Sequence, residues 1–383
     1  MDEEAILREF PIKRATAYLN NASYTPMFSS AIQEVSRQLK AFSENGPDDP
    51  YYLGFKNGAD ETRETLGRLL NAPARGFVFT ESATQAINLV ANGFRFARGD
   101  AIVTRGGATT EHPSDYLPWK HYAAAKGVTV LDVPVDAAGV PDLSELDSAL
   151  RETRARLLIT SHVLYNLGTV EPVREMCRVA HERGAAFFLD ASQSAGNIPV
   201  DLSSIGCDFA AGTASKWLCG PLGLGFLYCG DEAASLLEPL NFGANATEYA
   251  DNLSYKDITG PGRLQEGFRN WAYVYAFGTA IKAWEGLGAE RIGSGSMALA
   301  RAVVERISEM RSKYRLLVDF ADGRRTCIVP VETLQESPLD VVQRGLGRKV
   351  TVAQREFGSR RILRISPHFY NDTAEVERLF EVL

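Results

Sequence analysis

The stretch Ala185-Ala-Phe-Phe-Leu-Asp190-Ala-Ser-Gln-Ser194 joins an apolar run to a carboxylate and several small polar residues. Because its apolar residues are consecutive, the run is typical of a strand that is buried on both faces of a sheet. In open α/β sheets, ligands bind beyond the carboxyl ends of the strands, which is where Asp190 would stand. Taken alone, Asp190 could equally cap the next helix or turn.

Similar apolar runs alternate with helix-like segments through the middle of the chain. Helical spacing of apolar residues in Val173–Arg183, followed by Gly184 as a stop signal, predicts one such helix. Strands that alternate with helices indicate a parallel sheet covered on both faces, so the sequence predicts an α/β fold. The expected strands are Phe77–Phe79, Ala101–Thr104, Val128–Val133, Leu157–Thr160, Ala185–Leu189 and Phe209–Ala211, and a further helix is expected over Ala86–Phe94.

The pattern changes after about residue 245, where longer helical segments are expected. We therefore predict an N-terminal arm (1–15), a large domain (16–245) and a smaller C-terminal α+β domain (246–383). The expected helices of the small domain are Ile281–Gly288, Ala298–Lys313 and Thr373–Leu383, and its expected strands are Leu316–Val318, Thr326–Pro330 and Arg361–Ser366.

Length and composition exclude several classes of protein. The 383 residues, 45 % hydrophobic and 23 % charged, fit a soluble globular chain of about two domains. The formal charge of −7 argues against nucleic-acid binding, and the longest apolar runs are too short to span a membrane. Five cysteines without metal-type spacing favour a reduced, cytoplasmic protein with no metal site.

A second informative stretch is Gly212-Thr-Ala-Ser-Lys216-Trp-Leu-Cys-Gly-Pro-Leu-Gly-Leu-Gly225. A lone lysine is usually a solvated surface residue, but the neighbours of Lys216 are small or apolar. In such surroundings a lysine loses its proton more easily and becomes a nucleophile. Gly223 and Gly225 suggest a dinucleotide fingerprint only weakly, because Tyr228 stands where the third glycine is required.

A third stretch, Thr80-Glu-Ser82-Ala83-Thr84-Gln85, leads from an expected strand into an expected helix. Free N–H groups at the start of this helix, with the hydroxyl of Thr84, would suit a phosphate group. On its own, the segment is explained more simply by a Ser or Thr N-cap. A strand-end acid, a lysine in a buried context and a phosphate turn are together the parts needed to hold pyridoxal phosphate.

With these motifs the chain resembles the class V aminotransferase family of fold type I pyridoxal-phosphate enzymes, which includes cysteine desulfurases, isopenicillin N epimerase-like proteins and kynureninase. The resemblance begins at about Ala17 and implies a large domain with a mainly parallel seven-stranded sheet and a smaller α+β C-terminal domain. It also implies an amino-acid substrate and a homodimer with its active site near the interface. The matching segments are Tyr18–Ser23, Thr80–Leu89, Glu111–Ser114, Ser161–Val163, Leu167–Thr169, Asp190–Ser194, Thr213–Gly225 and Leu363–Asn371.

The resemblance assigns roles to individual residues. Lys216 would form the internal aldimine with the cofactor and then move protons at the substrate Cα, through a quinonoid intermediate. Asp190 would pair with the pyridine nitrogen, and His112 would stack on the ring. The remaining cofactor contacts would come from Gln193 at the ring hydroxyl, from Ala83, Thr84 and Thr213 at the phosphate, and from Asn166 and Ser215.

The resemblance also implies a substrate site, in which Arg364 clamps the α-carboxylate through two parallel bonds. Asn21 and Ser23 would line the pocket for the substrate side chain. Many members carry asparagine where this chain has Tyr165, so either Tyr165 or Asn166 contacts the cofactor. The role of Arg269 stays open.

The type of reaction is less well determined than the cofactor. A cysteine desulfurase needs a mobile loop cysteine ahead of the carboxylate arginine, and no cysteine lies between Gly345 and Arg364. We therefore disfavour a persulfide-forming desulfurase and expect an aminotransferase. An amino-acid C–S lyase, a desulfurase-like enzyme and an epimerase stay as alternatives. A nucleotide-binding dehydrogenase and a catalytically silent binding subunit are alternatives from other classes.

Overall fold

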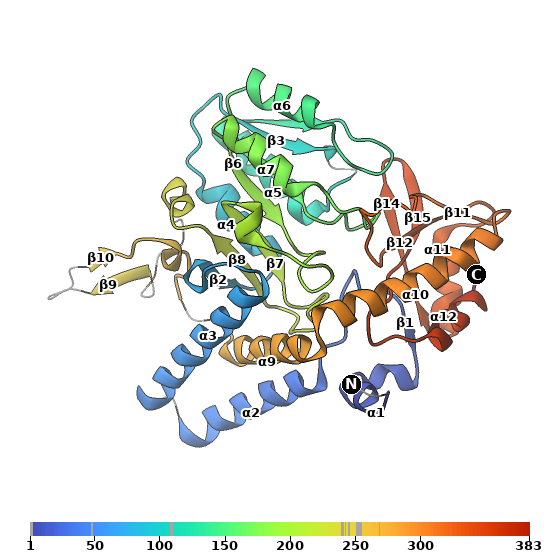
Figure 1. Cartoon of the computed structure of the whole chain (residues 1–383). Helices are drawn as coiled ribbons and strands as arrows, with labels where there is room; N and C mark the ends of the chain where they lie inside the picture. Colours follow the sequence, from blue (N-terminus) through green and yellow to red (C-terminus); the bar gives the residue numbers. More distant parts are fainter. Residues whose placement is uncertain are drawn as a thin grey trace.

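The computed structural model describes residues 3–46, 49–107, 110–238, 241, 243, 246–249, 255–267 and 269–383. Its centre is a seven-stranded sheet with the strand order β2-β8-β7-β6-β5-β3-β4 (Figure 1). This sheet confirms the predicted α/β fold. In the same order, the strands are Phe77–Thr80, Gly225–Cys229, Phe209–Thr213, Ala186–Asp190, Ala155–Ser161, Ala101–Arg105 and Thr129–Val133.

One strand of this sheet, β8, runs against the others, because it pairs antiparallel with both β2 and β7. The strands from β7 to β4 pair in parallel, as expected. The sequence predicted no strand over Gly225–Cys229. The expected strands alternate with helices, whereas this run is separated from β7 by an irregular loop. That loop turns back at the carboxyl end of β7 and carries Lys216 there.

Helices cover both faces of the sheet, which explains the continuous apolar runs of its strands. Phe187 points into the core formed with α6 and α7, and the next residue, Phe188, points into the core formed with α4 and α5. Gly184 follows the end of α7 with φ +74°, in agreement with its predicted role as a stop signal. These helices are α4 (Ala83–Gly93), α5 (Pro113–Lys126), α6 (Leu143–Glu152) and α7 (Val173–Glu182).

A group of helices extends the core on the α7 side of the sheet. The apolar helix α9 packs against α2 and α3, and its residues Val274, Phe277 and Ile281 are fully buried there. No helix of the described ranges is long and apolar enough to cross a membrane. The helices are α1 (Glu3–Glu9), α2 (Ser29–Asn45), α3 (Asp49–Leu69), α8 (Leu202–Ile205) and α9 (Trp271–Leu287).

A second, four-stranded antiparallel sheet has the order β11-β12-β15-β14 and its own hydrophobic core. The long helix α10 leads from α9 to this sheet (Figure 1). The strands are β11 (Tyr314–Leu316), β12 (Val329–Thr333), β14 (Ala353–Phe357) and β15 (Arg360–Ile365), and the helices are α10 (Ala289–Glu309), α11 (Pro338–Gly347) and α12 (Thr373–Phe380). The short strands β1 (Ala17–Tyr18) and β13 (Val350–Thr351) pair in parallel, and β9 (Thr247–Tyr249) pairs with β10 (Tyr255–Asp257).

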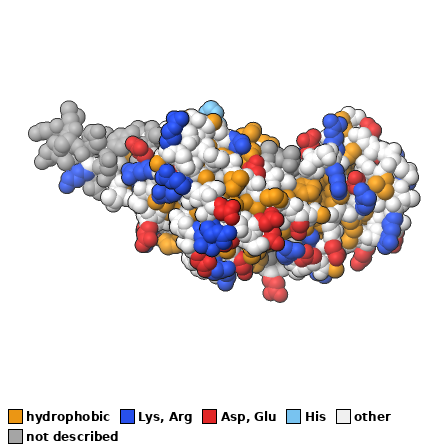
Figure 2. Space-filling model, turned by 90° about the horizontal axis from the view of Figure 1, so that it is seen from above, with side chains coloured by type: hydrophobic (Ala, Val, Ile, Leu, Met, Phe, Trp, Pro, Cys, Tyr) orange, Lys and Arg blue, Asp and Glu red, His pale blue; other side chains and the backbone are white. Residues whose placement is uncertain are grey.

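The residue boundaries of the predicted domains stay a prediction, and two sets of contacts cross them. The pairing of β1 with β13 joins the predicted large domain to the C-terminal part of the chain, and α9, which falls in the predicted small domain, packs in the first core. Strand β11 begins at Tyr314, before the expected start at Leu316, and strand β12 begins at Val329, after the expected start at Thr326. The expected ranges followed the apolar runs, which do not coincide with the hydrogen-bonded residues. On the face seen in Figure 2, basic and acidic side chains are intermixed, without a continuous basic patch.

Gly225 allows β8 to approach the start of α4. It lies in register with both Thr80 and Thr213, and a Cβ at this position would lie 2.6 Å from the carbonyl carbon of Ser82 and 2.8 Å from the nitrogen of Ala83. Both neighbours are backbone atoms, so they cannot move aside as a flexible side chain would.

We expect Gly225→Ala to lower the free energy of unfolding by about 1–3 kcal/mol, because the backbone must shift to admit the methyl group. Gly293→Ala is the control, since Gly293 lies inside α10 with no atom near the added Cβ. The control should be stabilised by about 0.5–1 kcal/mol. Denaturant unfolding measures both changes, and equal stability of Gly225→Ala and the parent would contradict the close approach.

Candidate active site

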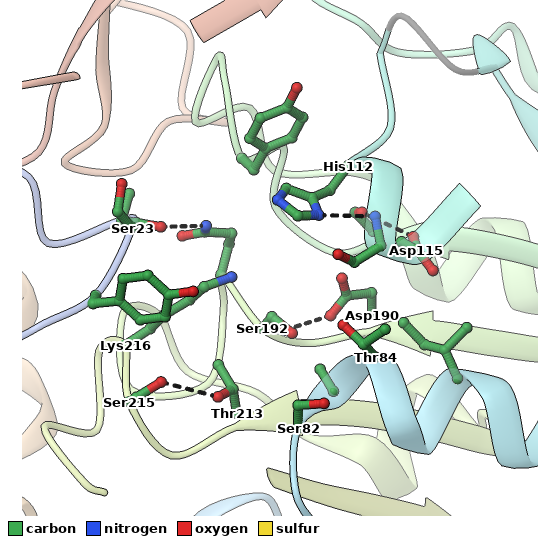
Figure 3. A pocket seen from close by; sticks show the side chains of 18 of the residues that line it. Ser23, Ser82, Thr84, His112, Asp115, Asp190, Ser192, Thr213, Ser215 and Lys216 are labelled. Atoms are coloured by element: carbon green, nitrogen blue, oxygen red, sulfur yellow. Dashed lines mark hydrogen bonds between the residues drawn. The ribbon is translucent and has the colours of Figure 1, made fainter. Parts of the chain in front are cut away.

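A cavity of about 400 Å³ lies at the carboxyl ends of β5, β6 and β7, beside the start of α4. Its volume is within the range of small-molecule sites. Residues of β14 and β15 in the second sheet form the opposite wall. Figure 3 shows side chains from these separate segments pointing into one space. The predicted residues that line it are Ser23, Ala83, Thr84, His112, Asp190, Gln193, Thr213, Ser215, Lys216 and Arg364.

Lys216 is half-buried and lines this cavity from the loop after β7. Burial lowers the pKa of its amine to about 8, and the positive charge of Arg364 acts in the same direction. The negative charge of Asp190 opposes both effects. An amine with this pKa is far more often unprotonated at neutral pH than a surface lysine, so Lys216 is suited to nucleophilic attack.

Asp190 ends β6 and is 9 % exposed. One of its oxygens, Oδ1, accepts a hydrogen bond of 2.7 Å from the backbone N–H of Ser192. This bond fixes the carboxylate in the turn that follows the strand, as the turn interpretation expected, while the side chain still lines the cavity. The turn interpretation is therefore confirmed, and the contact of Asp190 with a ligand stays a prediction that its position at the cavity allows.

The start of α4 offers unpaired donors to the cavity. Ser82 is the N-cap and accepts a hydrogen bond of 3.1 Å from the N–H of Gln85. The N–H groups of Ala83 and Thr84 have no hydrogen-bond acceptor among the described residues. Across from them, the hydroxyls of Thr213 and Ser215 lie 3.2 Å apart. N–H donors at a helix start together with hydroxyl groups form a site for a phosphate-sized anion.

His112 is held beside the cavity as the N-cap of α5. Its Nδ1 accepts a hydrogen bond of 3.2 Å from the N–H of Ser114. Its ring and the ring of Tyr165 form an edge-to-face pair with 4.9 Å between the ring centroids. Burial lowers the pKa of His112 to about 4, and the charge of Lys216 acts in the same direction. At neutral pH the ring is therefore uncharged and carries its proton on Nε2.

Two arginines without an acidic partner face the cavity from the second sheet. Arg364 is 1 % exposed and donates to the carbonyl of Tyr165 at 2.7 Å and to the hydroxyl of Ser23 at 2.5 Å. Arg355, on the neighbouring strand β14, donates to the same Ser23 hydroxyl. Neither guanidinium forms an ion pair within the described ranges. Burial disfavours the charged form and lowers the pKa of both groups from the ordinary arginine value. A carboxylate that entered the cavity would stabilise both charged guanidinium groups.

Sequence reasoning missed Arg355, because no motif surrounds it. Only the antiparallel pairing of β14 with β15 brings it beside Arg364. Tyr165 also lines the cavity, which favours Tyr165 over Asn166 for the contact that the sequence left open.

Three predicted residues, Asn21, Asn166 and Gln193, have side-chain polar groups bonded within the protein, as does Arg269, whose role the sequence left open. The amide of Gln193 donates to the carbonyl of Ala22 at 2.8 Å and accepts from the indole N–H of Trp217 at 2.9 Å. The side chain of Asn166 donates to the carbonyl of Glu356 at 2.9 Å and lies outside the cavity lining. Asn21 is fully buried, and its amide bonds to backbone and side-chain groups near Tyr370. Arg269 donates to the carbonyl of Phe79 and pairs with Glu266. The side chains of Asn166 and Asn21 therefore make structural contacts, and their contacts with a ligand stay a prediction.

The five cysteines are all buried, and none lines the cavity. Burial raises the pKa of each thiol above its ordinary value. A buried thiol with a raised pKa is a poor nucleophile.

The cavity fits pyridoxal phosphate on three observations. The amine of Lys216 is available for the aldehyde, and the carboxylate of Asp190 lines the same cavity for the ring nitrogen. The unpaired N–H groups of Ala83 and Thr84 suit the phosphate. Gly225 has no side chain that would crowd the N–H of Ala83.

Comparison with known proteins agrees with this fit. The model of the family described as Aminotransferase class-V matches residues 17–379. A probable cysteine desulfurase of Methanothermobacter thermautotrophicus is 31 % identical, over 100 % of this chain and 98 % of that protein. The isopenicillin N epimerase of Amycolatopsis lactamdurans is 30 % identical, over 96 % of this chain and 94 % of that protein.

Solved structures share the fold over the whole chain. The apo cysteine desulfurase of Thermococcus onnurineus NA1 superposes with a TM-score of 0.90 at 25 % identity, covering 99 % of this chain and 96 % of that one. A cystine C–S lyase, C-DES, determined with its product cysteine persulfide, has a TM-score of 0.88 at 22 % identity, covering 97 % and 98 %. The chain therefore belongs to the class V aminotransferase family and is a pyridoxal-phosphate-dependent enzyme.

Proposed function

We propose that this enzyme is a C–S lyase that cleaves the bond between Cβ and sulfur in a cysteine-type amino acid and releases the sulfur without a protein persulfide. The observation that carries the proposal is the lining of the cavity. It combines Lys216 with two arginines that form no ion pair within the described ranges, and it contains no cysteine.

The relatives support cleavage of a C–S bond over transamination, which the sequence analysis put first. The relative from Methanothermobacter thermautotrophicus is named a probable cysteine desulfurase, and it matches the whole chain. A protein of the same fold is named a cystine C–S lyase, so this architecture accommodates the reaction. The motifs alone do not separate these reactions, because all of them begin with removal of the same Cα proton.

The chain's own residues can bind and orient the substrate. Arg364 would hold the α-carboxylate through its guanidinium group. The Nε of this group has no hydrogen-bond partner in the described ranges and is free to donate to the substrate. Ser23 bridges Arg364 and Arg355 and keeps both in place. This clamp fixes the amino acid so that its Cα lies within reach of one base.

Lys216 would then take the Cα proton, since its lowered pKa leaves part of its amine free at neutral pH. The bound cofactor supplies the electron sink that makes this proton acidic. His112 is a much weaker base than Lys216, because burial lowers its pKa to about 4. Its Nε2–H can still donate a hydrogen bond.

Cleavage of the Cβ–S bond completes the reaction. The sulfur leaves with the bonding electrons and takes a proton, and the unsaturated amino acid that remains is converted by water into pyruvate and ammonium. No thiol lines the cavity to accept the sulfur, so it would depart as a thiol or persulfide in solution.

Arg355 would recognise a second carboxylate on the substrate. It lines the cavity beside Arg364 and has no acidic partner in the described ranges. An amino acid with carboxylates at both ends, such as cystine, would neutralise both guanidinium groups at once. We therefore propose cystine as the first substrate to test.

We also propose that the enzyme acts as a cytoplasmic homodimer. Tyr24 and Leu222 line the mouth of the cavity, and both side chains are more than half exposed. A second copy that covers them would remove apolar surface from water and close the site.

Incubation with cystine should produce pyruvate, ammonium and a persulfide in equal amounts, because the sulfur leaves directly. The intact mass of the enzyme should be unchanged afterwards, and Lys216→Ala should produce none of the products. Alanine in place of pyruvate, with sulfur added to the enzyme, would identify a desulfurase instead. A keto acid formed only with an added amino acceptor would identify an aminotransferase.

Substitution of the two arginines should separate their roles. Arg364→Gln should lower kcat/KM about tenfold or more for both cysteine and cystine, while Arg355→Gln should do so only for cystine. Arg361→Gln is the matched control, since Arg361 lies exposed on the same strand as Arg364 and should show no change. Equal losses on cysteine and cystine in Arg355→Gln would contradict a second carboxylate site.

A further inference from the structure

A second carboxylic acid, Asp115, lies in the wall of the cavity, and the mechanism above does not use it. It stands in the first turn of α5 and is 2 % exposed. Its Oδ2 meets the hydroxyl of Ser161 at 3.4 Å, and its Oδ1 has no hydrogen-bond partner among the described residues. Figure 3 shows Asp115 and Asp190 on the same side of the cavity.

The charges around Asp115 disfavour a second anion there. Arg105 is the nearest fixed cation, but it is paired with Glu111 at 2.9 Å and with Glu171 at 3.6 Å. Burial raises the pKa of Asp115 well above its usual value, and the negative charges of Asp190 and Glu111 raise it further, whereas the charge of Arg105 and the side chain of Trp119 lower it. The titratable and charged groups that surround it are Glu111 and His112 before α5, Arg105 on β3, Asp190 after β6, Lys216 after β7 and Glu171 beside Arg105.

Ser161 is placed to accept a hydrogen bond from Asp115. Its Oγ donates to Glu111 at 2.6 Å, so its own hydrogen is already used and its lone pairs are free. Ser161 also lies in register with Asp190 on the adjacent parallel strand. A hydrogen bond from Asp115 to Ser161 would therefore tie α5 to the strand end beside Asp190.

We propose that Asp115 is a positioning residue that works as a neutral acid: it keeps its proton, donates a hydrogen bond to Ser161, and leaves Asp190 as the negative charge that this wall offers to the cofactor. A neutral Asp115 holds the wall together without adding charge beside Asp190. This role concerns cofactor binding and does not depend on the C–S cleavage proposed above.

The test compares three variants of the full chain with added pyridoxal phosphate. Asp115→Asn keeps a donor to Ser161 but cannot ionise, Asp115→Leu removes the donor, and Asp190→Asn is the reference for a lost charge. Two quantities are measured: the dissociation constant of the cofactor, and the pH midpoint of its visible absorbance between about pH 6 and about pH 9.

We expect Asp115→Asn to match the parent in both quantities, and Asp115→Leu to bind the cofactor about fivefold to tenfold more weakly. Asp190→Asn should lower the pH midpoint, because a lost negative charge destabilises the protonated form. Asp132→Asn is the structural control, since Asp132 contacts Tyr116 of the same helix outside the cavity and should leave both quantities unchanged.

Two results would overturn the proposal. A lowered pH midpoint in Asp115→Asn, like that of Asp190→Asn, would show that Asp115 carries charge. Parent-like cofactor binding in Asp115→Leu would show that Asp115 positions nothing. If Asp115→Leu does not fold, Ser161→Ala removes the acceptor of the same bond, and it must weaken cofactor binding to a similar extent for the proposal to stand.

Discussion

The site depends on one amine that the protein encloses together with a single strand-end carboxylate. Burial and the charge of Arg364 push the pKa of Lys216 down, and Asp190 pushes it up, with about 8 as the balance. A fully exposed lysine would be too basic to attack an aldehyde at neutral pH, and a lysine paired closely with a carboxylate would be held as its cation. The groups around Lys216 therefore have to be placed without forming an ion pair with it.

In this fold the ends of several strands meet at one cavity, and this places the groups around Lys216. Parallel strands put Ser161 and Asp190 at the same edge, and the reversal from β7 to β8 brings Lys216 back to that edge. The second sheet then supplies Arg355 and Arg364 from the other side. These cations lie on a different layer from the unpaired N–H groups at the start of α4, so the proposed sites for the substrate carboxylate and the cofactor phosphate are separate.

Local motifs were enough to predict the residues that follow strands or begin helices. Asp190, Lys216 and Thr84 all line the cavity, because a strand end or a helix start fixes where such a residue points, and His112, which only the family resemblance indicated, lines it as well. Contacts made between distant segments were not predictable in this way. Asn166 was expected at the cofactor, but its amide bonds to Glu356 on β14, a strand that the sequence analysis did not identify.

The dependence on contacts between distant segments also explains the other differences between the predicted and the observed site. Arg355 enters the cavity through the pairing of β14 with β15, and Asp115 became informative only when its burial and its unpaired oxygen were known. Strand β8 was missed because no helix precedes it. The absence of a loop cysteine was visible in the sequence, and the structure adds that all five thiols lie outside the cavity.

The most direct test of the central claim is the rate at which cofactor-free enzyme takes up pyridoxal phosphate as a function of pH, followed by borohydride reduction and peptide mass mapping. The account predicts that the reduced cofactor is found on Lys216 and that the rate rises with a midpoint at about pH 8, as its amine loses its proton. Attachment to a different lysine, or a rate that continues to rise toward the ordinary lysine pKa, would contradict it.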